Sequence, residues 1–138
     1  MRFVATVVIA LFLGMFSEPI QAQQVQYLDN TLRTVKSARL ATYTRQLTPL
    51  GGEEFKAEIK TREGVVKVKG GYIKIKDELL EHGEFTFFYP NGAVESRGRY
   101  EKGVKVGVWE RYAMDGQRKP DRYYNPESAD VLRQVMNQ

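Results

Sequence analysis

The sequence predicts a mainly β protein: antiparallel hairpins follow one another in one open sheet, and a short helix ends the chain. A hairpin-sized unit that begins at Gly83 returns at Gly107, and Phe85 and Trp109 show the same spacing of 24 positions. Apolar and polar residues also alternate before these units, as in strands with one buried face. A fixed period of this size is typical of stacked supersecondary units, each too small to bury its apolar face alone.

Residues 1–22 have the pattern of a removable export signal. Arg2 is the basic start, and the apolar stretch from Phe3 to Phe16 is shorter than the roughly 20 residues that a spanning helix needs. We expect cleavage near Ala22 and a periplasmic or secreted protein; an uncleaved membrane anchor is the alternative. The sequence has no cysteine, so no lipid attachment thiol and no disulfide are available.

The rest of the chain is long enough for one small domain. The formal net charge is +4, and basic residues alternate with acidic ones almost throughout. A nucleic-acid-binding protein usually concentrates its basic residues on one face or in one run. We therefore expect no nucleic-acid partner.

Two segments precede the clear hairpins. Residues 23–54 predict β and turn structure, with a turn at 29–31, a helical turn at 37–40 and a strand at 41–47. Residues 55–76 alternate regularly and indicate a degenerate copy of the repeat, because its glycines match those of the next copy 28 positions later. The apolar parity changes at Gly70-Gly71, which predicts a bulge in preference to a turn.

The clear repeats occupy residues 83–106 and 107–124. Asn91-Gly92 and Asp115-Gly116 predict two-residue type I′ turns. In the first hairpin, such a turn places opposite residues at positions that sum to 183. That register pairs Phe85 with Gly98, Phe87 with Ser96, Tyr89 with Val94, Phe88 with Glu95, Thr86 with Arg97 and Glu84 with Arg99.

The remaining segments complete the expected sheet. Pro120 lacks a ladder donor and places the last strand at the sheet edge. Residues 77–81 are expected to be an acidic connector, and His82 is expected to be a turn residue rather than a ligand or base. Residues 125–138 predict a short helix that caps the open end of the sheet.

The candidate partner-binding residues lie on the charged face of the hairpins. Phe88 and Tyr112 recur at equivalent positions among charged residues that include Arg97 and Arg99. An aromatic stripe rimmed by mixed charge is typical of a binding surface. The alternative is burial of both rings under the N-terminal segment or the C-terminal helix.

The residue types disfavour an enzyme. With one histidine, no cysteine and no glycine-rich strand-to-helix turn, only carboxylates remain for catalysis, and opposing arginines or exposed strand positions explain these. We expect no catalytic, metal-binding or cofactor-binding residues.

The pattern Gly-x-aromatic-x-x-aromatic-x-x-Asn-Gly from residue 83, followed by Gly-Arg-Tyr at 98–100 and Gly-x-Trp at 107–109, resembles bacterial MORN-type repeats of YwqK-like, antitoxin-labelled proteins, here in an exported form. The resemblance implies an antiparallel hairpin array that acts as an interaction or scaffold module without a cofactor. The second copy departs from the pattern at 118–120.

Together these observations predict a non-enzymatic interaction module that binds another protein of the cell envelope through its aromatic face. The alternative is peripheral binding to anionic lipid or envelope polysaccharide through the strand lysines, namely Lys56, Lys60, Lys67, Lys69, Lys74 and Lys76. The oligomeric state and the identity of the partner do not follow from the sequence.

Overall fold

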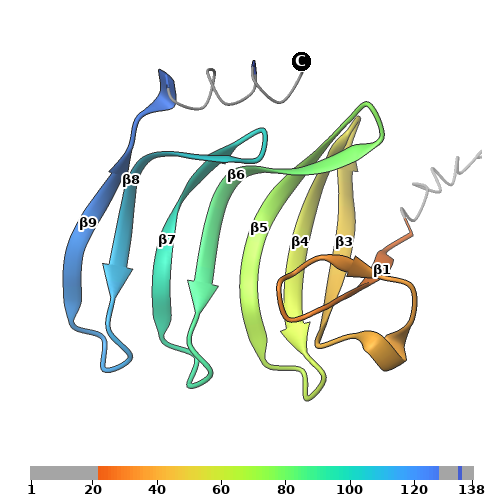
Figure 1. Ribbon diagram of the computed structural model, residues 1–138, viewed down its shortest axis with the longest axis horizontal. Helices are drawn as coiled ribbons and strands as arrows, with labels where there is room; N and C mark the ends of the chain where they lie inside the picture. Colours follow the sequence, from red (N-terminus) through yellow and green to blue (C-terminus); the bar gives the residue numbers. More distant parts are fainter. Residues whose placement is uncertain (1–21, 128–133, 135–138) are drawn as a thin grey trace, which may run out of the picture.

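The computed structural model describes residues 22–127 and residue 134, and the described strands form one open antiparallel sheet (Figure 1). The strand order is β2-β1-β3-β4-β5-β6-β7-β8-β9, so every strand from β3 onward pairs with its neighbour in sequence. This confirms the predicted open hairpin meander. The elements are β1 Gln24–Leu28, β2 Thr34–Val35, the 3₁₀ turn η1 Ala38–Leu40, β3 Tyr43–Gly51, β4 Glu54–Thr61, β5 Val66–Ile75, β6 Glu78–Phe88, β7 Val94–Glu101, β8 Val104–Tyr112 and β9 Arg118–Tyr124.

Two expected segments fall largely outside this description. The leader lies outside it except for Ala22, and the C-terminal helix lies outside it except for residues 125–127 and 134. The edge position expected for the proline-containing strand is confirmed, because β9 ends the sheet. Pro120 therefore occupies a position where a missing ladder donor is tolerated.

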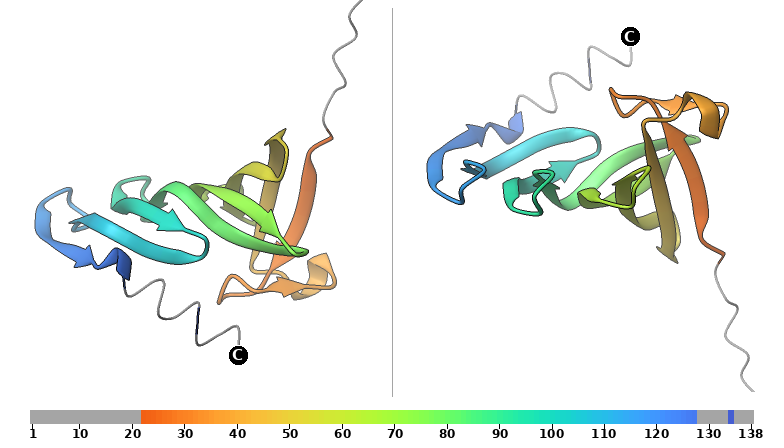
Figure 2. Two further views of the ribbon diagram at one scale, coloured as in Figure 1. Left: turned by 90° about the horizontal axis from the view of Figure 1, so that it is seen from above. Right: turned by 90° about the horizontal axis from the view of Figure 1, so that it is seen from below.

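The core lies on one face of the sheet, which we call the inner face. At the N-terminal end it is covered by the β1–β2 hairpin, which turns across the first strands of the sheet (Figure 2). Leu28 is fully buried there, in one cluster with Leu47, Ile59 and Val68. Burying such side chains contributes about 1.5–3 kcal/mol each relative to leaving them exposed.

A glycine and two aromatic rings recur in the same arrangement along the inner face. Gly70 lies opposite Phe85, and Gly98 lies against Trp109; a Cβ atom at either glycine would overlap the ring. The tyrosine two positions after each glycine meets that ring edge to face, with centroids 5.5 Å apart for Tyr72 and Phe85 and 5.2 Å apart for Tyr100 and Trp109. This repeated contact gives a structural account of the sequence period.

The hairpin turns differ from the prediction. Tyr89 donates its backbone N–H to the carbonyl of Ala93 over 2.8 Å, so three residues lie between the paired positions, not two. Only Gly92 of the expected pair has positive φ, at 86°. The same backbone bonds recur between Ala113 and Gln117 around the second turn. Type I′ geometry, with two successive positive φ values, occurs instead at the opposite end of the sheet, at 76–77 and 102–103.

The turn type changes the register only near the turn. Phe85 pairs with Gly98, Phe87 with Ser96, Thr86 with Arg97 and Glu84 with Arg99, as predicted, whereas Phe88 pairs with Val94 instead of Glu95. Glu95 is left as the extra residue of a bulge. The bulge restores the predicted alternation along the rest of the hairpin.

One local expectation on β5 is confirmed, and two on β6 are corrected. β5 runs through Gly70 and Gly71 without a turn, and its pairing with β6 shifts register between Gly70 and Tyr72, as the preference for a bulge predicts. The extra residues of this irregularity lie on β6, where Gly83 has a φ of 95°. The acidic segment belongs to β6 except for Asp77, which lies in the preceding turn. His82 is a strand residue whose Nδ1 accepts a hydrogen bond from the backbone N–H of Lys102 at 3.2 Å.

Candidate functional site

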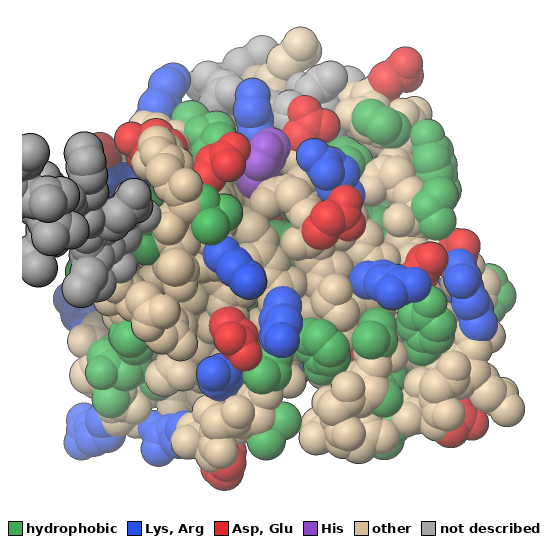
Figure 3. All heavy atoms as spheres, turned by 180° about the vertical axis from the view of Figure 1, so that it is seen from behind, with side chains coloured by type: hydrophobic (Ala, Val, Ile, Leu, Met, Phe, Trp, Pro, Cys, Tyr) green, Lys and Arg blue, Asp and Glu red, His purple; other side chains and the backbone are tan. Residues whose placement is uncertain are grey.

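The charged residues predicted to bind a partner lie on the outer face, where they pair with one another. Arg97 donates to Glu110 on the neighbouring strand, and Arg99 lies 3.4 Å from Glu84. Arg118 of β9 also approaches Glu110, at 3.6 Å. Seen from behind, Lys and Arg side chains intermingle with Asp and Glu side chains over this face (Figure 3). The charges of Arg97 and Arg99 are therefore largely compensated within the sheet.

The two predicted aromatic residues occupy different surroundings. The hydroxyl of Tyr112 donates to Glu110 over 3.0 Å, and the guanidinium of Arg118 lies 5.7 Å from its ring centroid. Phe88 lines a mainly apolar cavity of about 270 Å³ between hairpin tips, together with Val66 and Pro90. β7 separates the strands that carry the two residues. The structure does not bring the rings into one continuous stripe.

Glu110 makes a testable contribution to acid stability. The hydrogen bond from Arg97 lowers the pKa of the Glu110 carboxyl below its usual 4.5, and the hydrogen bond from Tyr112 lowers it further. A depressed carboxyl pKa stabilises the fold above the unfolded-state pKa, and this stabilisation is lost as the pH falls through the folded-state pKa. We expect Glu110→Gln to reduce stability at pH 7 and to show a smaller further loss below pH 4.5. Urea unfolding from pH 7 to pH 3 measures this; parallel pH profiles for the two proteins would contradict it.

A second cavity, of about 210 Å³, lies among the last three strands on the inner side. It has a strongly basic lining, and we call it the basic hollow. The described residues that line it are Tyr89, Glu95, Ser96, Lys105, Trp109, Arg111, Tyr112, Lys119, Arg122 and Tyr124.

The strand register builds the basic hollow. Arg111 of β8 lies opposite Ser96 on one side and Lys119 on the other, so these side chains form a row across three strands. One row further along, Arg122 of β9 lies opposite Trp109. Because side chains at alternate strand positions share a face, both rows project to the same side of the sheet.

Among the described residues, the cations of the basic hollow have no ion-pair partner. Lys105, Arg111, Lys119 and Arg122 form no ion pair within the described part of the chain, and Glu95 is the one carboxylate among the described lining residues. Like charges that share a partly enclosed site repel one another. An anion that entered would remove this repulsion.

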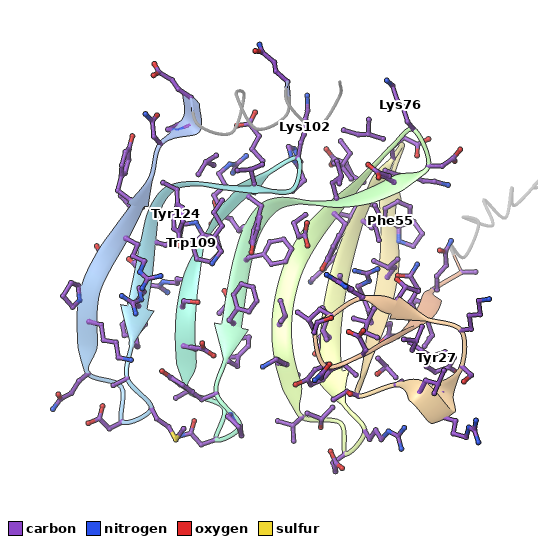
Figure 4. All side chains as sticks on the ribbon, viewed as in Figure 1. Tyr27, Phe55, Lys76, Lys102, Trp109 and Tyr124 are labelled. Atoms are coloured by element: carbon purple, nitrogen blue, oxygen red, sulfur yellow. The ribbon has the colours of Figure 1, made fainter. Side chains whose placement is uncertain are left out.

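The ammonium group of Lys105 lies among four aromatic rings, Phe87, Tyr100, Trp109 and Tyr124, which we call the aromatic cage. Its Nζ atom is 4.2 Å from the Trp109 centroid, 5.6 Å from that of Tyr124, 5.8 Å from that of Phe87 and 6.0 Å from that of Tyr100. Figure 4 shows Trp109 and Tyr124 close together on the last two strands. Burial raises the pKa of Tyr100, so its hydroxyl remains protonated.

The basic hollow was missed from the sequence because the lysines considered there lie elsewhere. Two of them have carboxylate neighbours, at 3.6 Å between Lys60 and Glu58 and at 3.5 Å between Lys74 and Asp77. The sequence spacing is Trp109-x-Arg111 on one strand and Lys119-x-x-Arg122 on the next, and regular alternation puts residues 119 and 122 on opposite faces. The cluster becomes visible only once these strands are placed side by side.

Residues 22–127 and 134 contain neither a metal-binding cluster nor a membrane-spanning helix. Within these residues, no three His, Cys, Asp or Glu side chains gather closely enough to hold a metal ion. No helix in the same part of the chain has the length and apolar character needed to cross a membrane.

Comparison with known proteins gave no relatives: no family model matches the chain, and no curated protein or solved structure matches it significantly. The resemblance to MORN-type repeats therefore stays a prediction from the residues.

Proposed function

We propose that this protein is an exported, non-enzymatic binding module whose basic hollow holds an anionic group of the cell envelope, from either a polysaccharide or a lipid. The observation that supports this proposal is the uncompensated charge of the hollow. Four cations line it, and the described lining residues offer them one carboxylate, Glu95. The arginines of the outer face, by contrast, have carboxylate partners.

The side-chain chemistry suits a phosphate, sulfate or carboxylate group. Arg111 and Arg122 each present a planar fork of donors that binds such oxyanions in a bidentate manner, and Lys119 adds a mobile point charge. Tyr124 adds a ring surface with a hydroxyl group, which suits a sugar ring or a headgroup. A small anionic group that can enter the hollow fits this arrangement better than a broad, flat anionic surface does.

Binding is a better account of the hollow than catalysis. General acid–base chemistry requires paired titratable groups near the reacting atoms, whereas here arginines and lysines surround one carboxylate. His82 accepts a hydrogen bond from the backbone of Lys102 and does not line the hollow.

A protein partner held by Phe88, Tyr112, Arg97 and Arg99, the proposal made from the sequence, ranks second. Arg97 and Arg99 already form cross-strand ion pairs, and surface pairs of this kind leave little net charge for a partner. The apolar cavity beside Phe88 is the feature that still favours this alternative.

Titration of the purified exported protein with inorganic phosphate, an acidic polysaccharide and phosphatidylglycerol vesicles tests the proposal. We expect Arg111→Gln combined with Arg122→Gln to weaken binding at least tenfold, because both forked donors are lost. Raising the salt concentration should weaken binding of the unmodified protein. Retention by the polysaccharide or by the vesicles identifies the source of the anion.

The matched control carries the same change of charge elsewhere: Lys56→Gln with Lys69→Gln on neighbouring strands β4 and β5. We expect this variant to bind like the unmodified protein. Equal losses in both double variants would show diffuse attraction to net positive charge and would overturn the hollow as the site. Failure of all three probes to bind would overturn the proposed function.

A further inference from the structure

The aromatic cage is a cation site that one of the chain's own side chains fills. Four rings lie within 6.0 Å of the Lys105 ammonium group, and Trp109, 1% exposed, is the nearest. Cation–π attraction extends to about 6 Å from a ring centroid, and Trp is the strongest ring partner. The cage is thus built to hold positive charge.

A primary ammonium is a poor match for this cage. It carries three N–H donors and is strongly hydrated, yet the Lys105 ammonium takes part in no hydrogen bond or ion pair among the described residues. A quaternary ammonium has no N–H donor and loses less hydration on entering a ring-lined site. Aromatic cages of this kind are the common recognition device for such groups.

We propose that the aromatic cage binds the quaternary ammonium of a phosphocholine group, and that Lys105 is an internal occupant which the ligand displaces. Trp109, Tyr124 and Lys105 belong to both the cage and the lining of the basic hollow, so a trimethylammonium in the cage places an attached phosphate near the cations of the hollow. The displaced Lys105 ammonium then pairs with that phosphate. This inference rests on the proposed anion-binding function and specifies its ligand.

The exchange makes and breaks no covalent bond, and it leaves the charge inside the cage unchanged. The cage loses one cation and gains another, so the cation–π attraction of the rings is retained. Lys105 gives up ring contacts and gains a charge-assisted hydrogen bond to phosphate, which is roughly twice as strong as a neutral one. Choline alone can fill the cage but offers the displaced Lys105 no phosphate. Inorganic phosphate alone offers Lys105 a partner but no cation to replace it in the cage.

Fluorescence titration of the full exported protein tests the inference. Trp109 is the sole tryptophan of the sequence, so its emission reports directly on the cage. We expect phosphocholine to bind at least tenfold more tightly than inorganic phosphate or choline. In Lys105→Ala the cage is vacated, and tetramethylammonium should bind at least tenfold more tightly than it binds the unmodified protein.

A cage-wall variant separates the cage from the hollow. Phe87→Leu removes a wall of the cage that does not line the hollow, and it leaves all four cations in place. Inorganic phosphate should bind this variant within about twofold of the unmodified protein, whereas the tenfold preference for phosphocholine should disappear. Circular dichroism confirms that the variant is folded, and Lys105→Ala provides an independent test if it is not.

The outcomes distinguish this inference from the proposed function. Phosphate binding without a preference for phosphocholine would overturn the cage inference and leave the anion site standing. If Lys105→Ala bound tetramethylammonium, the cage inference would be supported. If the unmodified protein then bound no phosphate, the proposed anion site would be overturned. Sedimentation with phosphatidylcholine vesicles would assign the group to lipid, whereas binding of soluble phosphocholine without sedimentation would assign it to a non-lipid carrier.

Discussion

Trp109→Ala is expected to lower the free energy of unfolding by about 3–5 kcal/mol, the usual cost of removing a large buried aromatic side chain. Trp109 is 1% exposed, and its ring meets those of Phe87, Tyr100 and Tyr124. Its indole N–H also donates to the carbonyl of Arg99 at 3.2 Å. The substitution therefore leaves a cavity, breaks three ring contacts and removes the donor to a carbonyl on β7.

Urea unfolding followed by far-ultraviolet circular dichroism measures this loss, because the variant has no tryptophan fluorescence. The control is Tyr123→Ala, an aromatic residue on the same edge strand as Tyr124 that is 70% exposed. We expect it to change stability by at most about 0.5 kcal/mol. A loss below about 1 kcal/mol for Trp109→Ala would show that the last hairpin does not depend on this ring.

The alternation of apolar residues was enough to predict the meander. The register was predicted from a two-residue turn, which the structure replaces by a three-residue loop. Glu84 still pairs with Arg99, and Phe85 with Gly98, because the bulge at Glu95 offsets the extra loop residue. The apolar alternation and the pairing within a hairpin are local features, and they do not depend on the structure of the rest of the chain.

The turn type was mispredicted because an Asn-Gly pair suits two kinds of hairpin loop. Pro90 favours the first central position of a type I turn, and Gly92 then takes the positive φ that follows it. The side chain of Asn91 accepts a hydrogen bond from the N–H of Ala93 at 3.0 Å. In the first hairpin the proline before the Asn-Gly pair was a signal for this loop, whereas the second hairpin forms the same loop with Met114 at that position.

The basic hollow was beyond the reach of pattern analysis because it depends on a bulge at the sheet edge. On β9, Arg122 pairs with Trp109 and Lys119 pairs with Arg111, so the three-residue step on β9 matches a two-residue step on β8. Both cations thereby point to the face of Arg111. Regular alternation places residues 119 and 122 on opposite faces, which hides the cluster.

Gly98→Ala is expected to lower the free energy of unfolding by about 1–3 kcal/mol, the usual cost of an extra methyl group in a packed core. Gly98 does not have positive φ, so alanine adopts its backbone conformation without strain. The cost arises from the added Cβ, which overlaps the ring of Trp109. That ring has little room to move, because Tyr100 and Tyr124 pack against it edge to face.

A double-mutant cycle separates this steric cost from other effects of replacing a glycine. In a Trp109→Leu background the ring is gone, so Gly98→Ala should cost at least about 1 kcal/mol less than in the unmodified protein. Gly92→Ala is the matched control, since its Cβ meets nothing within 4 Å and its cost arises from a φ of 86°. That cost should be the same in both backgrounds. If Gly98→Ala lowered the free energy of unfolding equally in both backgrounds, the contact between Gly98 and the Trp109 ring would not be what holds successive hairpins in register.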